Sequence, residues 1–362
     1  MSNFILYHFL AHYSKPTTAL FCHIKSVSKS GIISFTMKSD TVKQRFGWWP
    51  AVILLIILLV SCSVKKQKAS YSNLIMGTFC DLTFTPVPGI NSNELAAKVF
   101  DRLRYLESLW SIYQKESEVS RLNREGRIKP SPETLTLLKK SLEVSRISNG
   151  AFDITVAPLM AAWRESEKTG KLPDLKPLVP LVGYRKLGIE KNGTVRFLKK
   201  KMAIDLGGIG KGAAVDEAVS LLKSSGVKSG IVNLGGNLYA FGNGPHRGMW
   251  KVGIQNPRGS GAIGAISVKN QGVSTSGNYQ RYFEIGGKRY SHILNPQTGS
   301  LPDYPESVTV IAPTAVLADG FSTAFTVLGP ADAISLADTV PGVEALIIMP
   351  GTKSYRTKGF PR

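Results

Sequence analysis

The densest chemical signal in this chain of 362 residues is a glycine-rich segment, Asp205-Leu-Gly-Gly-Ile-Gly-Lys-Gly212. Its glycines leave main-chain N–H groups uncovered, Lys211 adds a positive charge, and the sequence that follows predicts a helix. Uncovered N–H groups at a helix N-terminus bind anions such as a pyrophosphate. The segment is not a Walker A loop, because no Ser or Thr follows Lys211-Gly212. Taken alone, it predicts either a pyrophosphate site or a simple turn between a strand and a helix.

A second chemical pattern lies in an apolar segment, Ala315–Leu328, which predicts a helix. Asp319 and Thr323 stand four residues apart, so they share one face of this helix. A carboxylate and a hydroxyl suit Mg²⁺, which takes one or two carboxylates and completes its shell with phosphate oxygens and water. The alternative is structural, with Asp319 as a helix cap and Thr323 hydrogen-bonded back to the helix main chain.

Three polar loops add further candidates, and each also has a purely structural interpretation. Asn233–Asn237 and Val273–Gly277 offer amides and hydroxyls to a polar ligand, or form ordinary turns. His292 precedes a turn built on Asn-Pro and Thr-Gly, which would fix its position. It is one of two histidines after residue 36, the other being His246. A lone histidine is more often structural than catalytic, so this motif alone leaves its role open.

The elements that must position these residues form a mixed pattern. Apolar periodicity predicts helices over residues 93–110, 133–148, 155–169, 212–224, 315–328 and 331–338. Short strands are expected over residues 80–85, 195–198, 203–206, 230–234, 250–255, 264–268, 272–274, 282–285, 307–312 and 345–349. Helices and strands do not alternate regularly, so the predicted fold class is α+β, a mixed α/β fold, with two closely associated subdomains.

The amino-terminal region has the pattern of an exported lipoprotein. Ala51–Val60 is an aliphatic run with the length of a signal-peptide core, too short to cross a bilayer as a helix. Basic residues precede it, and it leads into Leu59-Val60-Ser61-Cys62, which resembles a bacterial lipobox. The resemblance implies cleavage before Cys62 and diacylation of its thiol, which would anchor the protein firmly. The alternative is an uncleaved short anchor with an unmodified Cys62.

The position of this signal divides the chain into three parts. Met37-Lys38 has the character of a signal-peptide start, so residues 1–36 are expected to be an upstream extension. We therefore predict the extension plus signal peptide over residues 1–61, a lipid-anchored tether over 62–72 and a folded domain over 73–362. The domain would face the periplasm as a lipoprotein of the cell envelope, with the inner membrane as the favoured anchor site.

Composition narrows the classes of function. The chain has 45 Lys and Arg against 25 Asp and Glu, a formal net charge of +20. Residues 1–61 hold six of the basic and one of the acidic residues, which leaves +15 for residues 62–362. This charge suits an anionic membrane surface and an anionic ligand. Nucleic acid is not an expected partner, because the sequence has no basic-aromatic repeat. Three cysteines exclude a disulfide framework.

Taken in order, the motifs resemble those of the ApbE family of flavin transferases. The resemblance extends over about Ile75 to Phe325 and rests on the whole series rather than on one motif. The matching segments are Met76-Gly-Thr78, Ser117–Asn123, Gly150–Asp153, Pro158-Leu159, Trp163, Asp205–Gly212, Asn233–Asn237, Thr275–Gly277, His292-Ile293, Pro296, Thr298-Gly299 and Ala318–Ala324. The resemblance implies an FAD-binding flavin transferase domain over residues 73–362, with two subdomains of ApbE or T-fold-like type and the ligand site between them.

The resemblance also implies an activity and its residues. The protein would bind FAD with Mg²⁺ and transfer the FMN half of FAD to a threonine hydroxyl of a target protein, releasing AMP. The residues implied at FAD are Met76, Tyr113, Ala151, Phe152, Asp153, Asp205, Lys211 and Ile293. Mg²⁺ would be held by Asp319, Thr323 and the main-chain carbonyl of Gly208, and His292 would help the acceptor hydroxyl lose its proton. The usual targets of the family are subunits of sodium-pumping NADH:quinone oxidoreductases (Nqr) and of Rnf-type electron-transport complexes.

Two departures from the family pattern concern this chemistry. Ser322 stands where some members have a second Asp, so one metal ligand would be weaker or replaced by water. Asn295 stands where many members have an Asp, which removes a carboxylate near the reacting phosphorus and leaves the general base open. Two alternatives share the same binding residues: a lipoprotein that binds FAD without chemistry, and a pyrophosphatase that releases free FMN and AMP.

Overall fold

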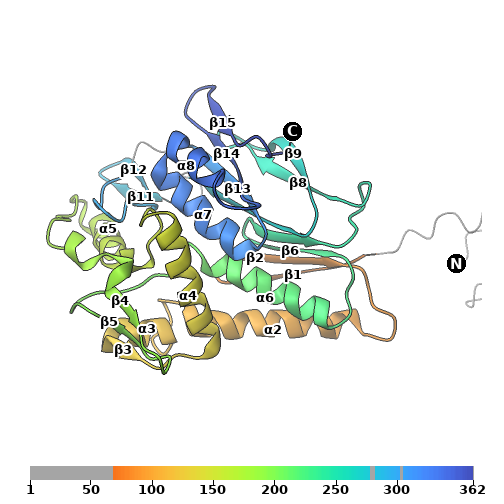
Figure 1. The fold of residues 1–362 in the computed structure, drawn as a ribbon, viewed down its shortest axis with the longest axis horizontal. Coiled ribbons are helices and arrows are strands. Elements are labelled where there is room, and N and C mark those ends of the chain that lie inside the picture. The colour runs from red at the N-terminus through yellow and green to blue at the C-terminus, as the bar shows by residue number, and fades with distance from the viewer. Residues whose placement is uncertain (1–67, 278–281, 302–304, 362) are drawn as a thin grey trace, which may run out of the picture. The chain divides into compact units, whose positions relative to one another are not determined.

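The computed structural model describes residues 68–277, 282–301 and 305–361, and its centre is an eight-stranded antiparallel sheet (Figure 1). The strand order in this large sheet is β1-β2-β6-β7-β10-β13-β14-β15. The bounds are β1 Ala69–Ile75, β2 Thr78–Phe84, β6 Gly230–Leu234, β7 Asn237–Phe241, β10 Gln271–Gly277, β13 Ser307–Ala312, β14 Glu344–Ile348 and β15 Ser354–Arg356. Neighbours β1–β2 and β6–β7 are joined by two-residue turns, whereas the central pair β10–β13 comes from segments farther apart in the chain.

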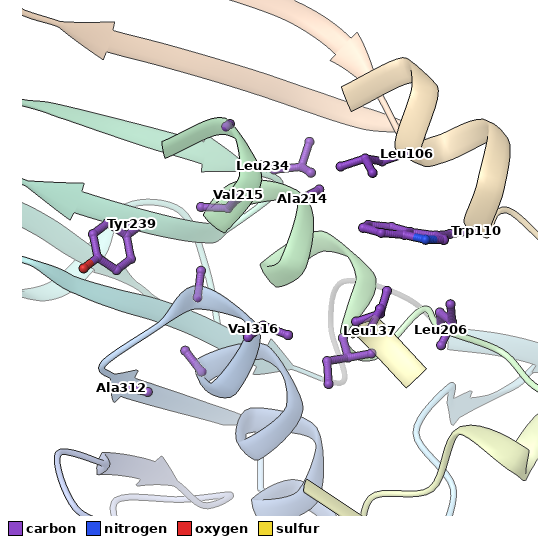
Figure 2. Packing of buried hydrophobic residues seen from close by; sticks show 14 of the residues in the cluster. Leu106, Trp110, Leu137, Leu206, Ala214, Val215, Leu234, Tyr239, Ala312 and Val316 are labelled. Atoms are coloured by element: carbon purple, nitrogen blue, oxygen red, sulfur yellow. The ribbon is translucent and has the colours of Figure 1, made fainter. Parts of the chain in front are cut away.

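Helices cover one face of the large sheet. They are α2 (Ser92–Trp110), α6 (Gly210–Ser224), α7 (Ala315–Leu328) and α8 (Pro330–Ala337). Alternate strand residues such as Val308 and Val310 of β13 point to these helices and join the main hydrophobic core. Figure 2 shows α6 enclosed within this core, with Leu106 and Trp110 of α2 on one side and Val316 of α7 on another. The sheet therefore fixes α6 and α7 against each other.

The opposite face of the sheet carries a hairpin, β8 (Trp250–Gln255) and β9 (Ala262–Val268). Trp250 and Ile254 are buried in a second hydrophobic cluster with Leu238 of β7 and Val273 of β10. Because period-two alternation sends neighbouring strand residues to opposite faces, β7 and β10 are covered on both sides. This explains why β7 is buried along its whole length.

The remaining elements pack beside the sheet and its helices. They are α3 (Glu118–Glu125), α4 (Pro132–Ile147), α5 (Ala157–Thr169), the short 3₁₀ helices η1 (Ile154–Val156), η2 (Val179–Leu181) and η3 (Tyr184–Lys186), a small sheet β3-β5-β4 (Arg127–Ile128, Val195–Phe197, Leu187–Ile189) and a hairpin β11–β12 (Tyr282–Ile285, Lys288–Ser291). A small apolar cluster holds α5 to this hairpin, with Trp163 stacked on Phe283 at a centroid distance of 6.0 Å.

The mixed α/β fold class is confirmed. All described elements belong to one packed unit within Lys66–Arg362, and one large core reaches from the sheet into α3 and α4. The helix expected over 93–110 is α2, capped by Asn91, whose side chain accepts from the N–H of Asn93. The other predicted helices are found with ends shifted by at most two residues, and α7 has the predicted ends.

The strand expected over residues 203–206 does not form. The segment is extended but joins no sheet, because a side chain takes the place of a neighbouring strand. The amide of Asn123 accepts from the N–H of Ile204 (2.7 Å) and donates to its carbonyl (2.9 Å). Both main-chain groups of Ile204 are therefore satisfied without a ladder.

Strand β1 begins at Ala69, so residues 69–72, which were expected to belong to the tether, are part of the large sheet. Tyr71 stacks on Phe84 with ring centroids 5.8 Å apart, and the hydroxyl of Ser72 donates to Asp81 (2.8 Å). Cys62, the aliphatic run and the start at Met37 lie outside the described residues. Within the described part of the chain, no helix has both the length and the hydropathy needed to cross a bilayer.

Candidate active site

A cavity of about 720 Å³ opens where one end of the large sheet meets α6, α7 and the start of α5. This volume lies in the range typical of ligand sites. The sheet contributes its turns, with Gly77 and Thr78 after β1 and Gly235 and Gly236 after β6. Of the residues that the sequence places at FAD, at the metal and at the proton transfer, those lining the cavity are Tyr113, Ala151, Phe152, Asp153, Asp205, Gly208, Lys211, His292, Ile293, Asp319 and Thr323.

Met76 is the predicted FAD residue that does not line this cavity. It occupies the β1–β2 turn with a positive φ of 50°, a left-handed conformation that is uncommon for a residue with a side chain. Gly77 follows with φ 71° and does line the cavity. The turn thus brings main-chain atoms to the site, with the Met76 side chain beside them.

The glycine-rich loop is held in place by its own aspartate and by Arg164 of α5. Asp205 Oδ1 accepts from the N–H of Gly207 (2.8 Å), and its Oδ2 forms an ion pair with Arg164 Nη2 (3.2 Å). Lys211 Nζ lies 3.3 Å from the carbonyl oxygen of Gly207. Two cationic side chains, Arg164 and Lys211, therefore line the cavity beside the loop. The glycines leave fewer main-chain N–H groups uncovered than the sequence suggests, because those of Gly207, Gly210 and Gly212 donate within the protein. Arg164 was not predicted, because its partner is 41 residues away in sequence.

Helix α6 approaches α7 closely because residue 212 is a glycine. A Cβ at Gly212 would collide with the main-chain carbonyl of Ala315 and lie 2.7 Å from the Cβ of Asp319. The N–H of Gly212 instead donates to Asp319 Oδ2 at 2.9 Å. Burial raises the pKa of Asp319, and the nearby Lys211 charge and the Gly212 N–H partly offset this increase. Asp319 is 4% exposed, so its carboxylate is aimed into the site from a rigid interface of two helices.

Gly208, Asp319 and Thr323 each bring an oxygen atom that could bind a metal ion to this part of the cavity. Thr323 Oγ1 lies 3.3 Å from the carbonyl oxygen of Asp319 and 3.5 Å from that of Gly208. The carboxylate of Asp319, the hydroxyl of Thr323 and the carbonyl of Gly208 are all hard ligands of the kind Mg²⁺ prefers. Among the described residues, no cluster of three or more His, Cys, Asp or Glu could form a metal cage. These donors thus suit an ion that also takes phosphate oxygens and water as ligands.

Ser322 does not line the cavity. Its hydroxyl is fully buried, 2.8 Å from Ser276 Oγ and 3.1 Å from Ser274 Oγ, and it donates to the carbonyl of Asp319 (2.9 Å). Ser274 in turn donates to Asn237 Oδ1 (2.6 Å). This chain of hydrogen bonds ties α7 to β10 and β7. In this protein, position 322 therefore serves to fix α7 rather than to present an oxygen to the cavity.

Asp153 lines the same cavity, but its carboxylate is fully engaged with the protein. Oδ1 accepts from the N–H (2.8 Å) and the hydroxyl (2.6 Å) of Thr155, and Oδ2 accepts from the N–H of Tyr184 (2.6 Å). Burial raises the pKa of Asp153, and these hydrogen bonds lower it in part. Asp153 thus caps η1 and joins it to the segment at Tyr184, which positions Ala151 and Phe152.

The outer wall of the cavity is formed by Tyr113 and the segment after β12. Tyr113 is 80% exposed, with the Arg164 guanidinium 5.7 Å from its ring centroid, so its ring is available to a ligand at the mouth. His292 and Ile293 line the wall directly after β12. Asn295 Oδ1 accepts from the N–H of Gln297 (2.9 Å) and so shapes the turn that brings Pro296 to the cavity.

Comparison with known proteins identifies the family of the chain. The chain matches the ApbE family over residues 76–347. It is 30% identical over 351 residues to an FAD:protein FMN transferase of Treponema pallidum, covering 90% of this chain and 96% of the relative. It is 29% identical over 336 residues to an FAD:protein FMN transferase of Vibrio cholerae, covering 86% of this chain and 97% of the relative.

Solved structures agree with the sequence comparison. The crystal structure of the ApbE protein from Thermotoga maritima superposes with a TM-score of 0.75 at 30% identity, covering 82% of this chain and all of that one. The flavin transferase ApbE from Vibrio cholerae gives a TM-score of 0.73 at 27% identity, covering 81% of this chain and 98% of that one. The chain belongs to the ApbE family.

Proposed function

We propose that this protein is a Mg²⁺-dependent FAD:protein FMN transferase, which moves FMN from FAD to a threonine hydroxyl of a target protein and releases AMP. One observation carries the proposal: a single cavity gathers a glycine-rich loop, two cationic side chains, three oxygen atoms that could bind a metal ion, and His292. The relatives at about 30% identity, named FAD:protein FMN transferases, support the same activity.

The residues suit each part of such a transfer. Lys211 and Arg164 would bind the pyrophosphate oxygens of FAD, while the exposed ring of Tyr113 offers an aromatic face to its rings. A Mg²⁺ ion held by Asp319, Thr323 and the Gly208 carbonyl would neutralise negative charge on the phosphates. His292 would take the proton of the acceptor threonine as its oxygen bonds to the FMN phosphorus. The bond from this phosphorus to the bridging oxygen breaks, and that oxygen leaves with AMP.

The proposed setting is the bacterial cell envelope. Cleavage before Cys62 and lipidation of its thiol would anchor the protein to the inner membrane, facing the periplasm. The order of basic flank, aliphatic core and lipobox-like sequence supports this anchoring. Nqr-type and Rnf-type subunits are the proposed acceptors, because such subunits also lie at the membrane.

The direct test incubates the purified protein with FAD, Mg²⁺ and the soluble domain of an Nqr-type acceptor subunit. We expect a fluorescent flavin band on the acceptor after denaturing electrophoresis, together with one AMP per flavin attached. EDTA should abolish the band, and so should replacement of the acceptor threonine by valine. Release of free FMN and AMP without a labelled protein would instead establish a pyrophosphatase, and FAD binding without turnover would establish a carrier.

A further inference from the structure

An exposed apolar pair lies next to the mouth of the active site. Leu74 of β1 and Phe79 of β2 are direct cross-strand partners, and they are 64% and 68% exposed. Their side chains point to the face of the sheet that the helices do not cover, since Ile75, Cys80 and Leu82 fill the opposite side. Leu74 and Phe79 thus form a contiguous apolar step on the open face of the β1–β2 hairpin.

Among the described strands, β1 pairs only with β2, so it forms one edge of the large sheet (Figure 1). It is seven residues long, contains no charged residue or proline, and pairs with β2 in unbroken register. The two-residue turn makes Ile75 and Thr78 a hydrogen-bonded pair, so the main-chain groups of Ser70, Ser72 and Leu74 face away from β2. Edge strands are usually protected by short length, charge, proline or bulges. The opposite edge, β15, has only three residues and ends in Arg356.

This edge leads directly to the cavity. The cavity is lined by Gly77 of the β1–β2 turn and by Thr78, the first residue of β2. Phe79 follows directly. At about 3.3 Å per residue, Leu74 lies roughly 7 Å along the strand from the β1–β2 turn that begins at Met76. An extended segment paired with β1 would therefore have one of its ends at the mouth of the active site.

We propose that the acceptor protein docks on β1 as an added strand, and that the strand delivers its threonine to the cavity past the β1–β2 turn. This inference rests on the proposed transfer of FMN to a protein. Main-chain hydrogen bonds to Ser70, Ser72 and the carbonyl of Leu74 supply affinity, since the N–H of Leu74 already donates to Asn73 Oδ1 (2.9 Å). An apolar side chain packed on Leu74 and Phe79 sets the register. The partner it fits is an extended, uncharged segment with an apolar residue about two positions from its threonine.

The test compares acceptor kinetics in variants of the hairpin. Leu74→Thr combined with Phe79→Thr keeps side chains that favour strands while removing the apolar step. We expect the KM for the soluble domain of an Nqr-type acceptor subunit to rise at least 10-fold, with kcat and the Kd for FAD unchanged. Tyr355→Thr is the matched control, because it removes an exposed aromatic residue from the opposite edge strand and should leave the acceptor KM at its original value.

A second variant tests the main chain of the edge. Ser72→Pro removes an N–H that faces away from β2, so the main-chain ladder of β1 and β2 keeps its hydrogen bonds. Ser72→Ala is its control, because both variants lose the hydroxyl that donates to Asp81 and only the proline loses the N–H. Ser72→Pro should raise the acceptor KM in the same way, and circular dichroism and FAD binding would show that the fold is intact.

The outcomes separate the two proposals. If the original protein labels no acceptor, the proposed transfer itself fails. If it labels the acceptor and all hairpin variants keep the original KM, docking on β1 is wrong. If the hairpin variants bind phosphatidylglycerol vesicles less tightly than the original protein while the acceptor KM is unchanged, the surface binds the membrane. If they instead self-associate less, with the same acceptor KM, the surface binds a second copy. Either result would overturn the docking proposal.

Discussion

Asp153 and Asp319 are buried carboxylates on two walls of one cavity, and burial raises the pKa of each. Their surroundings differ in the number of hydrogen-bond donors. Among the described residues, Asp153 accepts from three donors, whereas one main-chain N–H, from Gly212, donates to Asp319, and Lys211 lies nearby. A carboxylate with three donors is fixed in a structural role, and one with a single donor keeps lone pairs for a cation. The same residue type thus organises one wall and offers a ligand on the other.

The largest expected effect comes from removing the ligand carboxylate. Asp319→Asn keeps an oxygen that can accept from the N–H of Gly212, so the helix interface should remain intact. The amide carries no negative charge for the cation, and we expect the rate of FMN transfer to fall by about 100-fold or more. The rate is measured from the flavin fluorescence of the acceptor in reactions stopped at set times. A thermal melt checks that the variant is folded.

Gly212→Ala tests the close approach of α6 and α7. The new Cβ would collide with the carbonyl of Ala315, so the helices must separate, at a cost of about 3 kcal/mol in free energy of unfolding. Gly210→Ala is the matched control, because its nearest neighbour would be the Cβ of Leu206 at 3.9 Å. Urea unfolding of both variants checks the difference, and equal stabilities would show that the contact is relaxed at little cost.

Asp216 is an intermediate case with two donors, the N–H groups of Ala315 (2.8 Å) and Val316 (2.9 Å) at the start of α7. Burial raises its pKa to about 6, above the ordinary 3.8 of the unfolded chain. The folded state therefore binds a proton more tightly than the unfolded state. This contribution to stability is complete below about pH 4 and is lost as the pH rises through about 6.

The free energy of unfolding, taken as wild type minus Asp216→Asn, should fall by about 2–3 kcal/mol between pH 4 and pH 7. Denaturant unfolding at several pH values measures this difference. A difference that stays constant across the range would contradict the assigned pKa.

The smallest expected effect is at Asp153. Asp153→Asn places an amide N–H against one of its donors, which should lower the free energy of unfolding by about 1–2 kcal/mol. The metal dependence of FMN transfer should not change, because the three donors already occupy this carboxylate. Urea unfolding and a Mg²⁺ titration of the same variant measure the two properties, and a shifted metal midpoint would remove the distinction between Asp153 and Asp319.

The sequence was most informative where chemistry and conformation are local. The glycine loop, the helix that holds Asp319 and the turn after His292 are short segments, and their candidates Asp205, Lys211, Asp319, Thr323 and His292 line one cavity. The fold class followed from periodicity for the same reason. Sequence could separate neither the roles of Asp153 and Asp319 nor the role of Ser322, since these depend on donors from other elements.

Long-range pairing limited the remaining predictions. The Asn123 amide holds Ile204 across 81 residues, so the segment before the glycine loop looks like a strand but is none. Strand β7 is buried on both faces and shows no alternation, and β1 is polar enough to resemble a tether. Each of these features is set by a partner that the local sequence does not indicate.

The most direct measurement of the proposed metal site is a Mg²⁺ titration of FMN transfer to an Nqr-type acceptor domain by the original protein, Asp153→Asn and Asp319→Asn side by side. The number of hydrogen-bond donors around each carboxylate predicts that the original protein and Asp153→Asn reach half-maximal transfer at the same Mg²⁺ concentration. For Asp319→Asn it predicts a midpoint raised at least 10-fold or no transfer at any Mg²⁺ concentration. Transfer by Asp319→Asn with the original rate and midpoint would contradict the assignment of Asp319 as the carboxylate that holds the metal.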